Sequence, residues 1–327
     1  MVCLPISPPG QYGHKTSSIY PIYKISMTET QTETQKKETW LLVINPISGG
    51  KKKDDIVGQV EVFLDVHAIH YIHYYLTGFQ DKQAIQQLLV KVSPDKAIAI
   101  GGDGTCNLLA ICILGTGIPM GTIPAGSANG MALDLGIPVQ TDNALQILLR
   151  NKIKHLDMLR INEKYYSLHL SDAGLNAQLI YRFEQSGKRG KWSYFKEMLR
   201  ALFRINTFGF HLSCNDKHYR MRAVMLAFAN ASRYGSGAIL NPGGQPDDRK
   251  FEICIVRWFP WYRIPALAWH FFKGDVNLVP EMRIISTDRA YIRFKRKVLI
   301  QADGELLGHH KHLEVVLEPG IVPFIVA

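Results

Sequence analysis

Between residues 40 and 125, short apolar runs alternate with longer amphipathic or apolar segments. The runs are WLLVINP (40–46), HYIHYYLT (70–77), KAIAI (96–100) and PMGTIP (119–124), and each ends at or just before Pro or Gly. Such runs are typical of strands. The segments between them, 54–64, 81–90 and 106–114, are predicted to be helices. Strands that alternate with helices predict a parallel sheet with helices on its faces.

After about Asp157 the pattern changes to closely spaced β-type runs. FGFHLSC (208–214), RKFEICIVRW (249–258) and HLEVVLEP (312–319) are examples. A series of this kind predicts an antiparallel sandwich or a barrel-like domain. The predicted fold is therefore an α/β N-terminal domain with a parallel sheet and glycine-rich loops, followed by a mainly antiparallel β-sandwich C-terminal domain.

We expect three regions along the chain. Residues 1–37 are polar and turn-rich and are predicted to be a disordered tail; a start of translation at Met27 is a further hypothesis. Residues 38–156 form the expected α/β domain and residues 157–312 the β-rich domain. For the last segment, about 313–327, a return to the α/β domain is left open.

The composition is that of an ordinary globular protein, with 46% hydrophobic and 20% charged residues, which excludes a largely disordered chain. Because every run of about 18 residues is interrupted by charge, we expect no transmembrane helix. The first 26 residues lack a compact apolar core, so we expect no signal peptide. The five cysteines are scattered without a C-x-x-C pair, which fits a reducing cytoplasm.

The net charge of +10 is concentrated in two segments, 182–204 and 283–297, which carry a net +5 each. Localised positive charge indicates a polyanionic partner, which is either nucleic acid or the anionic face of a membrane. A solvated surface without a partner is the alternative.

Three glycine-rich loops follow predicted strands: NPISGGKKK (45–53), GGDGT (101–105) and PAGSANGMA (124–132). Glycine lets successive backbone amides approach an anion closely, and two of these loops open helices whose N-terminal ends favour negative charge. In open α/β sheets such loops line the ligand crevice at the carboxyl ends of the strands. The three loops together predict a triphosphate site, although neither a Walker A motif nor a dinucleotide fingerprint is present.

The order of these loops, with ADGE at 302–305, resembles the diacylglycerol kinase catalytic-domain superfamily, which includes sphingosine kinases, ceramide kinases and bacterial lipid kinases. The resemblance runs from about Leu41 to the C-terminus. It implies a two-domain lipid kinase, with a nucleotide-binding α/β domain and a lipid-binding β-rich domain, that uses ATP and Mg²⁺ as cofactors.

The resemblance also implies roles for individual residues. The expected nucleotide-binding residues are Asn45, Ser48, Gly49, Thr77, Gly101, Gly102, Gly104, Thr105, Gly126, Ser127 and Asn129. The expected catalytic residues are Asp303, Asp103 and Glu305, with Asp103 also a metal ligand and Glu305 holding Mg²⁺ through water. Phosphoryl transfer needs metal charge on the phosphates and a carboxylate that accepts the proton of the substrate hydroxyl. Either Asp303 or Asp103 is expected to be that base.

The sequence departs from the family at three positions. The third loop reads PAGSANG, whereas diacylglycerol kinases usually have P-x-G-T-x-N-D there. Gln178 stands where sphingosine kinases carry an aspartate for the substrate ammonium, which favours a neutral lipid alcohol, although nearby Asp172 could compensate. Asp247 and Asp248 match a segment that holds a structural Mg²⁺ in some relatives, but Arg249 replaces a glycine, so a solvated turn competes with a metal site at Asp248.

Two segments are candidate membrane surfaces. Residues 188–204 contain a predicted amphipathic helix, with Trp192, Phe195 and Leu199 on its apolar face and cations beside them. WFPWYRIPALAWHFFK (258–273) is rich in aromatic residues but too interrupted to span a bilayer. Packing of each helix on its own domain is the alternative. We expect a cytoplasmic enzyme that associates peripherally with an anionic membrane.

The leading hypothesis is a kinase for a diacylglycerol-like membrane lipid. Other hypotheses are a sphingosine- or ceramide-type lipid kinase, a soluble kinase similar to NAD kinases, and a non-catalytic membrane adaptor. A nucleic-acid partner is not expected, because it would explain the charge but not the three loops. A homodimer is left open.

Overall fold

The computed structural model describes residues 37–50, 53–185, 206–234 and 238–327, which divide into two compact units. The α/β unit comprises the described residues up to Ser127 together with Leu135–Lys154 and Pro323–Ala327. The β unit comprises Ala128–Asp134 and the described residues of His155–Val322. Most of the N-terminal tail and the basic segment 188–204 lie outside the described residues.

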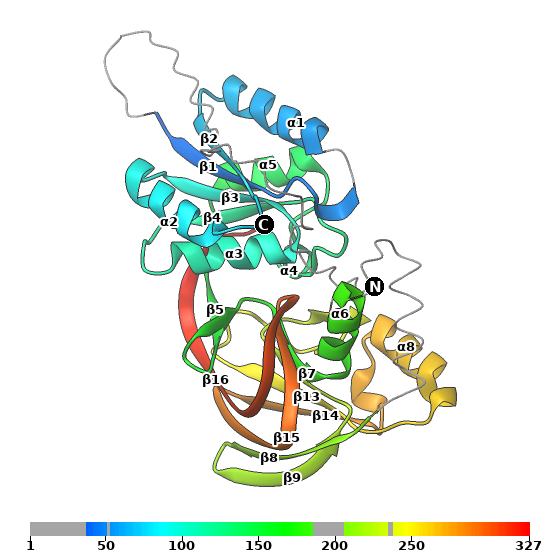
Figure 1. Cartoon of the computed structure of the whole chain (residues 1–327). Coiled ribbons are helices and arrows are strands. Elements are labelled where there is room, and N and C mark those ends of the chain that lie inside the picture. The colour runs from blue at the N-terminus through cyan, green and yellow to red at the C-terminus, as the bar shows by residue number, and fades with distance from the viewer. Residues whose placement is uncertain (1–36, 51–52, 186–205, 235–237) are drawn as a thin grey trace. The chain divides into compact units, whose positions relative to one another are not determined.

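The α/β unit is built on a parallel sheet in the order β2–β1–β3–β4. Its strands are β1 (Thr39–Ile44), β2 (His70–Tyr75), β3 (Lys96–Gly101) and β4 (Met120–Pro124), and Phe324 pairs in parallel with Met120 on β4. Its helices are η1 (Ser48–Gly50), α1 (Lys53–Val66), α2 (Asp81–Val92), α3 (Asp103–Ile113) and α5 (Thr141–Arg150). Figure 1 shows α1 and α5 on one face of this sheet and α2 and α3 on the other.

Burial explains why the central strands of this unit are apolar. Helices cover both faces of the sheet, so every residue of β3 is buried, as are Trp40–Ile44 of β1. Lys96 is the charged residue of β3, and its buried ammonium is stabilised by two contacts. Its Nζ donates to the carbonyl of Leu148 and lies 2.9 Å from a carboxylate oxygen of Glu38. The predicted alternation of strands and helices is thus confirmed.

The β unit is mainly antiparallel, and the predicted sandwich class is confirmed. Its strands are β5 (Ile153–Ile161), β6 (Tyr165–Ser167), β7 (Leu170–Gly174), β8 (Phe208–Cys214), β9 (Lys217–Ala223), β10 (Met225–Ala229), β11 (Arg233–Tyr234), β12 (Ala238–Ile239), β13 (Phe251–Val256), β14 (Met282–Thr287), β15 (Arg289–Ala302) and β16 (Glu305–Ile325), the last of which extends into the α/β unit. Its helices are α4 (Gly130–Asp134), α6 (Leu175–Gln185), η2 (Trp261–Arg263), α8 (Ile264–Lys273) and η3 (Val276–Leu278).

The long strand β15 belongs to both layers of the β unit. Its first half pairs with β8 and its last residues pair with β7, and its register with β16 shifts between Arg293 and Val298. A shift of this kind bends a strand. One apolar cluster therefore lies between the layers, and includes Phe210, Phe228 and Phe294.

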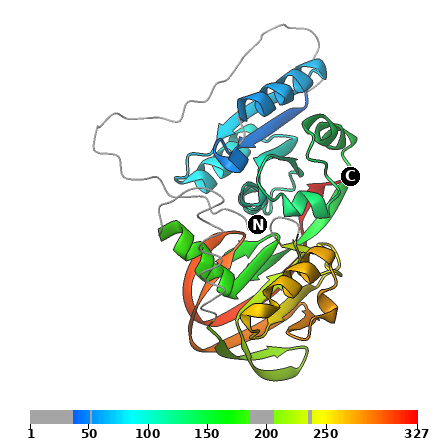
Figure 2. The same cartoon turned by 90° about the vertical axis from the view of Figure 1, so that its right-hand side faces the viewer.

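A second cluster lies beneath α8, which Figure 2 shows facing the viewer. No helix among the described residues is both long and apolar enough to cross a membrane.

Candidate active site

Four loops leave the α/β unit at the same edge of its sheet. Ile44 is paired with both Tyr75 and Ile100, and Gly101 is paired with Pro124, so the carboxyl ends of the four parallel strands are level. The expected nucleotide-binding residues of this unit lie at or just after those ends: Asn45, Ser48, Gly49, Thr77, Gly101, Gly102, Gly104, Thr105, Gly126 and Ser127. This edge is where open α/β sheets bind ligands.

The three glycine-rich loops contact one another. The amide of Asn45 donates to the carbonyl of Ile100 (3.0 Å), and its side-chain Nδ2 donates to Oγ1 of Thr105 (3.3 Å). The hydroxyl of Ser48 donates to the carbonyl of Ala125 (3.3 Å), whose amide donates to the carbonyl of Gly101 (2.7 Å). Three segments far apart in sequence therefore form one continuous surface.

Two of the glycines have no room for a side chain. A Cβ at Gly49 would lie 2.4 Å from the carbonyl oxygen of Ala125, and Gly49 has a left-handed φ of 69°. A Cβ at Gly101 would lie 2.3 Å from Oγ1 of Thr105. Backbone without Cβ atoms at the mouth of a parallel sheet is the feature that phosphate-binding loops share.

Asp103 is the first residue of α3 and is buried, with 8% of its surface exposed. Gly102 precedes it in an extended conformation, and Gly104 and Thr105 lie in the first turn. The N-terminal end of a helix stabilises both a carboxylate and a phosphate. The second loop therefore combines an acidic side chain with a helix end that favours anions.

Thr77 differs from the other predicted residues. Its amide and its hydroxyl both donate to Oδ1 of Asp81, each at 2.9 Å, and the amide of Gly78 donates to Oδ2 (2.7 Å). These bonds fix the loop to the first turn of α2. None of them joins Thr77 to the three glycine-rich loops.

The third glycine-rich loop passes from one unit to the other. Gly126 and Ser127 belong to the α/β unit, whereas Asn129 belongs to the β unit. Asn129 directly precedes α4 and is buried, with a φ of 54°, and its carbonyl accepts the amide of Leu133 (3.1 Å).

Within the β unit, the carboxylate of Asp303 is held by backbone amides. Asp303 and Gly304 connect β15 to β16 and both have positive φ, as a tight hairpin turn requires. Oδ2 of Asp303 accepts the amide of Leu168 (2.9 Å), and Oδ1 accepts that of Leu170 (3.0 Å). Oδ2 also accepts the amide of His169 (3.5 Å), so the carboxylate is fixed in position by three backbone amides.

The protein surroundings raise the pKa of both acidic residues at this turn. Burial raises the pKa of Asp303, although the charge of His169 and the donated amides act in the opposite direction. Desolvation also raises the pKa of Glu305, although the residue reaches the surface, and the charge of Asp303 raises it further. A raised pKa makes a carboxylate a stronger base.

A buried His–Asp pair, which the sequence pattern does not predict, lies next to Asp303. Nε2 of His169 lies 3.6 Å from Oδ2 of Asp134, whose oxygens also accept the hydroxyl of Ser232 (2.6 Å) and the amide of Arg233 (3.1 Å). Burial acts to raise the pKa of Asp134, but His169 and these donors together lower it.

The position of Gly130 explains this pair. A Cβ at Gly130 would lie 2.6 Å from Cε1 of His169, so the imidazole occupies the space of a side chain. Diacylglycerol kinases usually have aspartate at this point of the third loop. The glycine found here is the feature of the sequence that could have indicated a bulky neighbour such as His169.

Asp172 does not compensate for the neutral Gln178. It is fully buried, and its carboxylate accepts hydrogen bonds from the amide of Ala177 (3.1 Å), from Asn176 (2.7 Å) and from Gln301. Asp172 therefore fixes the start of α6 and is not presented to a ligand. Gln178 lies half-buried on α6.

Asp248, the second candidate metal ligand, lies in a turn. Oδ1 of Asp248 accepts the amide of Lys250 (3.0 Å), as in an ordinary turn. Among the residues that the structure describes, no group of three or more His, Cys, Asp or Glu could hold a metal ion. Such groups comprise side chains only, so the metal site at Asp248 and the solvated turn both stay predictions.

Comparison with known proteins covers both units. Residues 39–161 match the family described as diacylglycerol kinase catalytic domain, and residues 171–326 match the YegS C-terminal NAD kinase beta sandwich-like domain. A protein of Yersinia pestis named "Probable lipid kinase YegS-like" is 25% identical over 232 residues, which are 67% of this chain and 75% of that protein.

Two solved structures from Bacillus anthracis share the fold. One, titled as a diacylglycerol kinase structure, has a TM-score of 0.68 at 19% identity and covers 90% of this chain and 98% of its own. The other has a TM-score of 0.72 at 22% identity, with coverages of 90% and 99%.

The buried His–Asp pair predicts how stability depends on pH. Because the pKa of Asp134 is lowered on folding, its ionised form stabilises the protein at neutral pH, and this contribution is lost as the pH falls through the folded-state value. We expect Asp134→Asn to lower the free energy of unfolding by about 2 kcal/mol at neutral pH, and the difference to shrink below about pH 4. Urea unfolding at a series of pH values measures this.

Asp142→Asn is the matched control, since Asp142 is an exposed residue in the first turn of α5. Its effect should stay within about 0.5 kcal/mol at every pH. A difference between wild type and Asp134→Asn that is constant across the pH series would contradict the prediction.

Proposed function

Since the chain belongs to the diacylglycerol kinase catalytic-domain superfamily, a family of kinases, we propose that it transfers the γ-phosphate of ATP to the hydroxyl of a membrane lipid. A diacylglycerol-like alcohol is the favoured acceptor. The observation that carries the proposal is the continuous surface of three glycine-rich loops, in which Gly49 and Gly101 leave no space for a Cβ. The name of the Yersinia relative supports a lipid acceptor.

The roles of the residues follow from their chemistry. The loops around Asn45–Gly49, Gly101–Thr105 and Gly126–Ser127 bind the phosphates through backbone amides, while Asp103 and Glu305 are the residues that would hold Mg²⁺. When bound, Mg²⁺ neutralises charge on the phosphates. The buried carboxylate of Asp103 beside a glycine-rich loop fits that role.

Asp303 is the favoured base, with Asp103 as the alternative. The raised pKa and the fixed position of the Asp303 carboxylate suit a group that accepts the proton of the lipid hydroxyl. As that proton leaves, the hydroxyl oxygen forms a bond to the γ-phosphorus and the bond to ADP breaks.

The residues near Gln178 favour a neutral acceptor. A substrate ammonium needs a carboxylate that faces it, and Asp172 is fully buried and occupied. Diacylglycerol and ceramide fit this environment better than sphingosine does.

The experiment that tests the function is incubation with labelled ATP and micelles of diacylglycerol, ceramide, sphingosine or monoacylglycerol, with NAD as a soluble competitor. We expect label on diacylglycerol and a loss of about 100-fold or more in turnover for Asp303→Asn. Asp103→Asn, assayed in parallel, tests the alternative base. Label on NAD alone would support the soluble kinase, and label on no acceptor would support the non-catalytic adaptor.

The close contact at Gly49 gives a second prediction. Gly49→Ala forces a Cβ against the carbonyl of Ala125, so we expect KM for ATP to rise about tenfold or more, with a smaller change in KM for lipid. Gly117→Ala is the matched control, because Gly117 also has a positive φ (73°) but nothing lies within 4 Å of its Cβ position. Equal effects of the two substitutions on KM for ATP would contradict the prediction, because they would show that the strain of a positive φ, and not the contact with Ala125, causes the change.

The aromatic segment 258–273 is the proposed membrane surface. Leu267 and Phe259 are buried against the β unit, and Pro265 and Gly274 mark the two ends of α8. Five large aromatic side chains of the segment are between 57% and 67% exposed, namely Trp258, Trp261, Tyr262, Trp269 and Phe272. Tryptophan and tyrosine suit the boundary between headgroups and acyl chains. We propose that this surface associates peripherally with the bilayer that contains the substrate.

Removal of two of these side chains tests the surface. We expect Trp261→Ser with Trp269→Ser to weaken vesicle sedimentation about tenfold or more, while activity on a short-chain soluble substrate changes little. Val66→Ser with Val90→Ser is the control, because both valines are exposed apolar residues on helices of the α/β unit. Unchanged sedimentation of the tryptophan variant would rule out this surface.

A further inference from the structure

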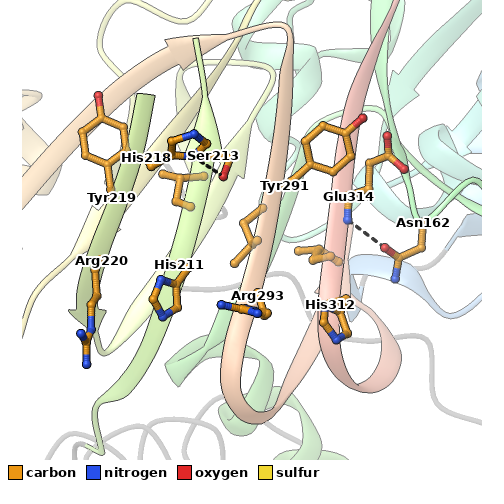
Figure 3. Close-up of a pocket in the computed structure, with 13 residues that line it drawn as sticks. Asn162, His211, Ser213, His218, Tyr219, Arg220, Tyr291, Arg293, His312 and Glu314 are labelled. Carbon is orange, nitrogen blue, oxygen red and sulfur yellow. Dashed lines mark hydrogen bonds between the residues drawn. The ribbon is translucent and has the colours of Figure 1, made fainter. Parts of the chain in front are cut away.

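A groove of about 690 Å³ lies on the solvent face of strands β8, β9, β15 and β16. It is separate from the acidic hairpin turn at Asp303, which lies at the opposite end of β15. Figure 3 shows a row of basic side chains across its four strands: Arg220, His211, Arg293 and His312.

The register of the sheet makes this row continuous. His211 is directly opposite Arg220 on one side and Arg293 on the other, and Arg293 is directly opposite His312. Adjacent strands are about 4.8 Å apart, so the four side chains extend over about 14 Å.

The row has no acidic partner in the described part of the chain. Neither Arg220 nor Arg293 has a carboxylate within ion-pair distance there, and both are exposed. The groove is also lined by the carboxylate of Glu314. Glu314 lies two residues beyond His312 on β16 and is directly opposite Tyr291, so it belongs to the neighbouring row. Arg220 and Arg293 flank His211 from the two neighbouring strands, so the row carries two permanent positive charges that an anion would neutralise.

The neighbouring side chains can complete an anion site. Ser213 and His218 hydrogen-bond each other (2.8 Å) in the next row, and a hydroxyl and an imidazole can each donate to an anion. Arginine presents a planar set of donors that matches phosphate oxygens. An extended ligand with several negative charges fits the row better than a single monoanion does.

We propose that this groove, which we call the basic groove, is a second anion site that binds a phosphate-bearing ligand with several negative charges. The same chemistry is present in the headgroups of anionic phospholipids and in soluble polyphosphates. The proposal does not depend on the kinase activity, because the site is defined by the β unit alone.

Two binding measurements with the full chain test the proposal. Calorimetry with tripolyphosphate tests a soluble ligand, with a non-hydrolysable ATP analogue at saturation to fill the glycine-rich loops. Sedimentation with vesicles of phosphatidic acid or of phosphatidylcholine, without nucleotide, tests a lipid headgroup. We expect Arg220→Gln with Arg293→Gln to weaken binding of at least one of the two phosphate probes about tenfold or more.

Lys217→Gln with Arg289→Gln is the matched control. It removes the same charge from β9 and β15 at positions that do not line the groove, and should change binding less than about twofold. Arg293→Lys, which keeps the charge but not the planar donors, should give an intermediate loss, and circular dichroism checks that each variant is folded.

The outcomes are distinguishable. Loss with tripolyphosphate identifies a soluble ligand, and loss with phosphatidic acid vesicles alone identifies a lipid headgroup. Equal losses for the two double variants, or no binding of either probe by wild type, would overturn the proposal in favour of a solvated surface. Tighter binding of an RNA duplex than of both phosphate probes would replace it with a nucleic-acid site.

Discussion

The close approach between the backbone at Gly49 and the carbonyl of Ala125 is the contact on which the nucleotide-binding half of the site depends. It joins the first glycine-rich loop to the third, and the bond from Ala125 to Gly101 joins the third to the second. The parallel sheet places the three loops at one edge, but only these short contacts make them one surface. A similar set of contacts exists in the β unit. The carboxylate of Asp303 accepts the amides of Leu168, His169 and Leu170, and these bonds fix the acidic turn relative to β7.

The parts that the sequence could predict are those encoded locally. Strands β1 to β4 are marked by apolar runs, and their loops by glycine, so both the fold class and the expected phosphate surface could be inferred before any coordinates. The β unit could be assigned to a class from its closely spaced runs. Its strand pairing could not be derived, because β15 changes partner along its length and no local pattern encodes that change.

The remaining features depend on tertiary contacts. His169 and Asp134 are separated by 34 residues, and neither looks unusual in its own segment. The basic groove joins residues 220, 211, 293 and 312, of which only Arg293 lay in a segment marked by its charge. Asp172 shows the opposite error: its position suggested contact with a ligand, whereas burial and three hydrogen bonds commit it to the start of α6.

The return of Pro323–Ala327 to the α/β unit has a consequence for biosynthesis. Phe324 extends the first sheet beside β4, and the amide of Val326 donates to the carbonyl of Lys152 (2.9 Å). The sheet that forms around residue 40 is therefore finished by residues made almost 290 positions later. During translation, the first unit therefore stays incomplete until the second has been made. A protein cut between the two units would keep the pairing of β4 with β3 but would lose the partner on the other edge of β4.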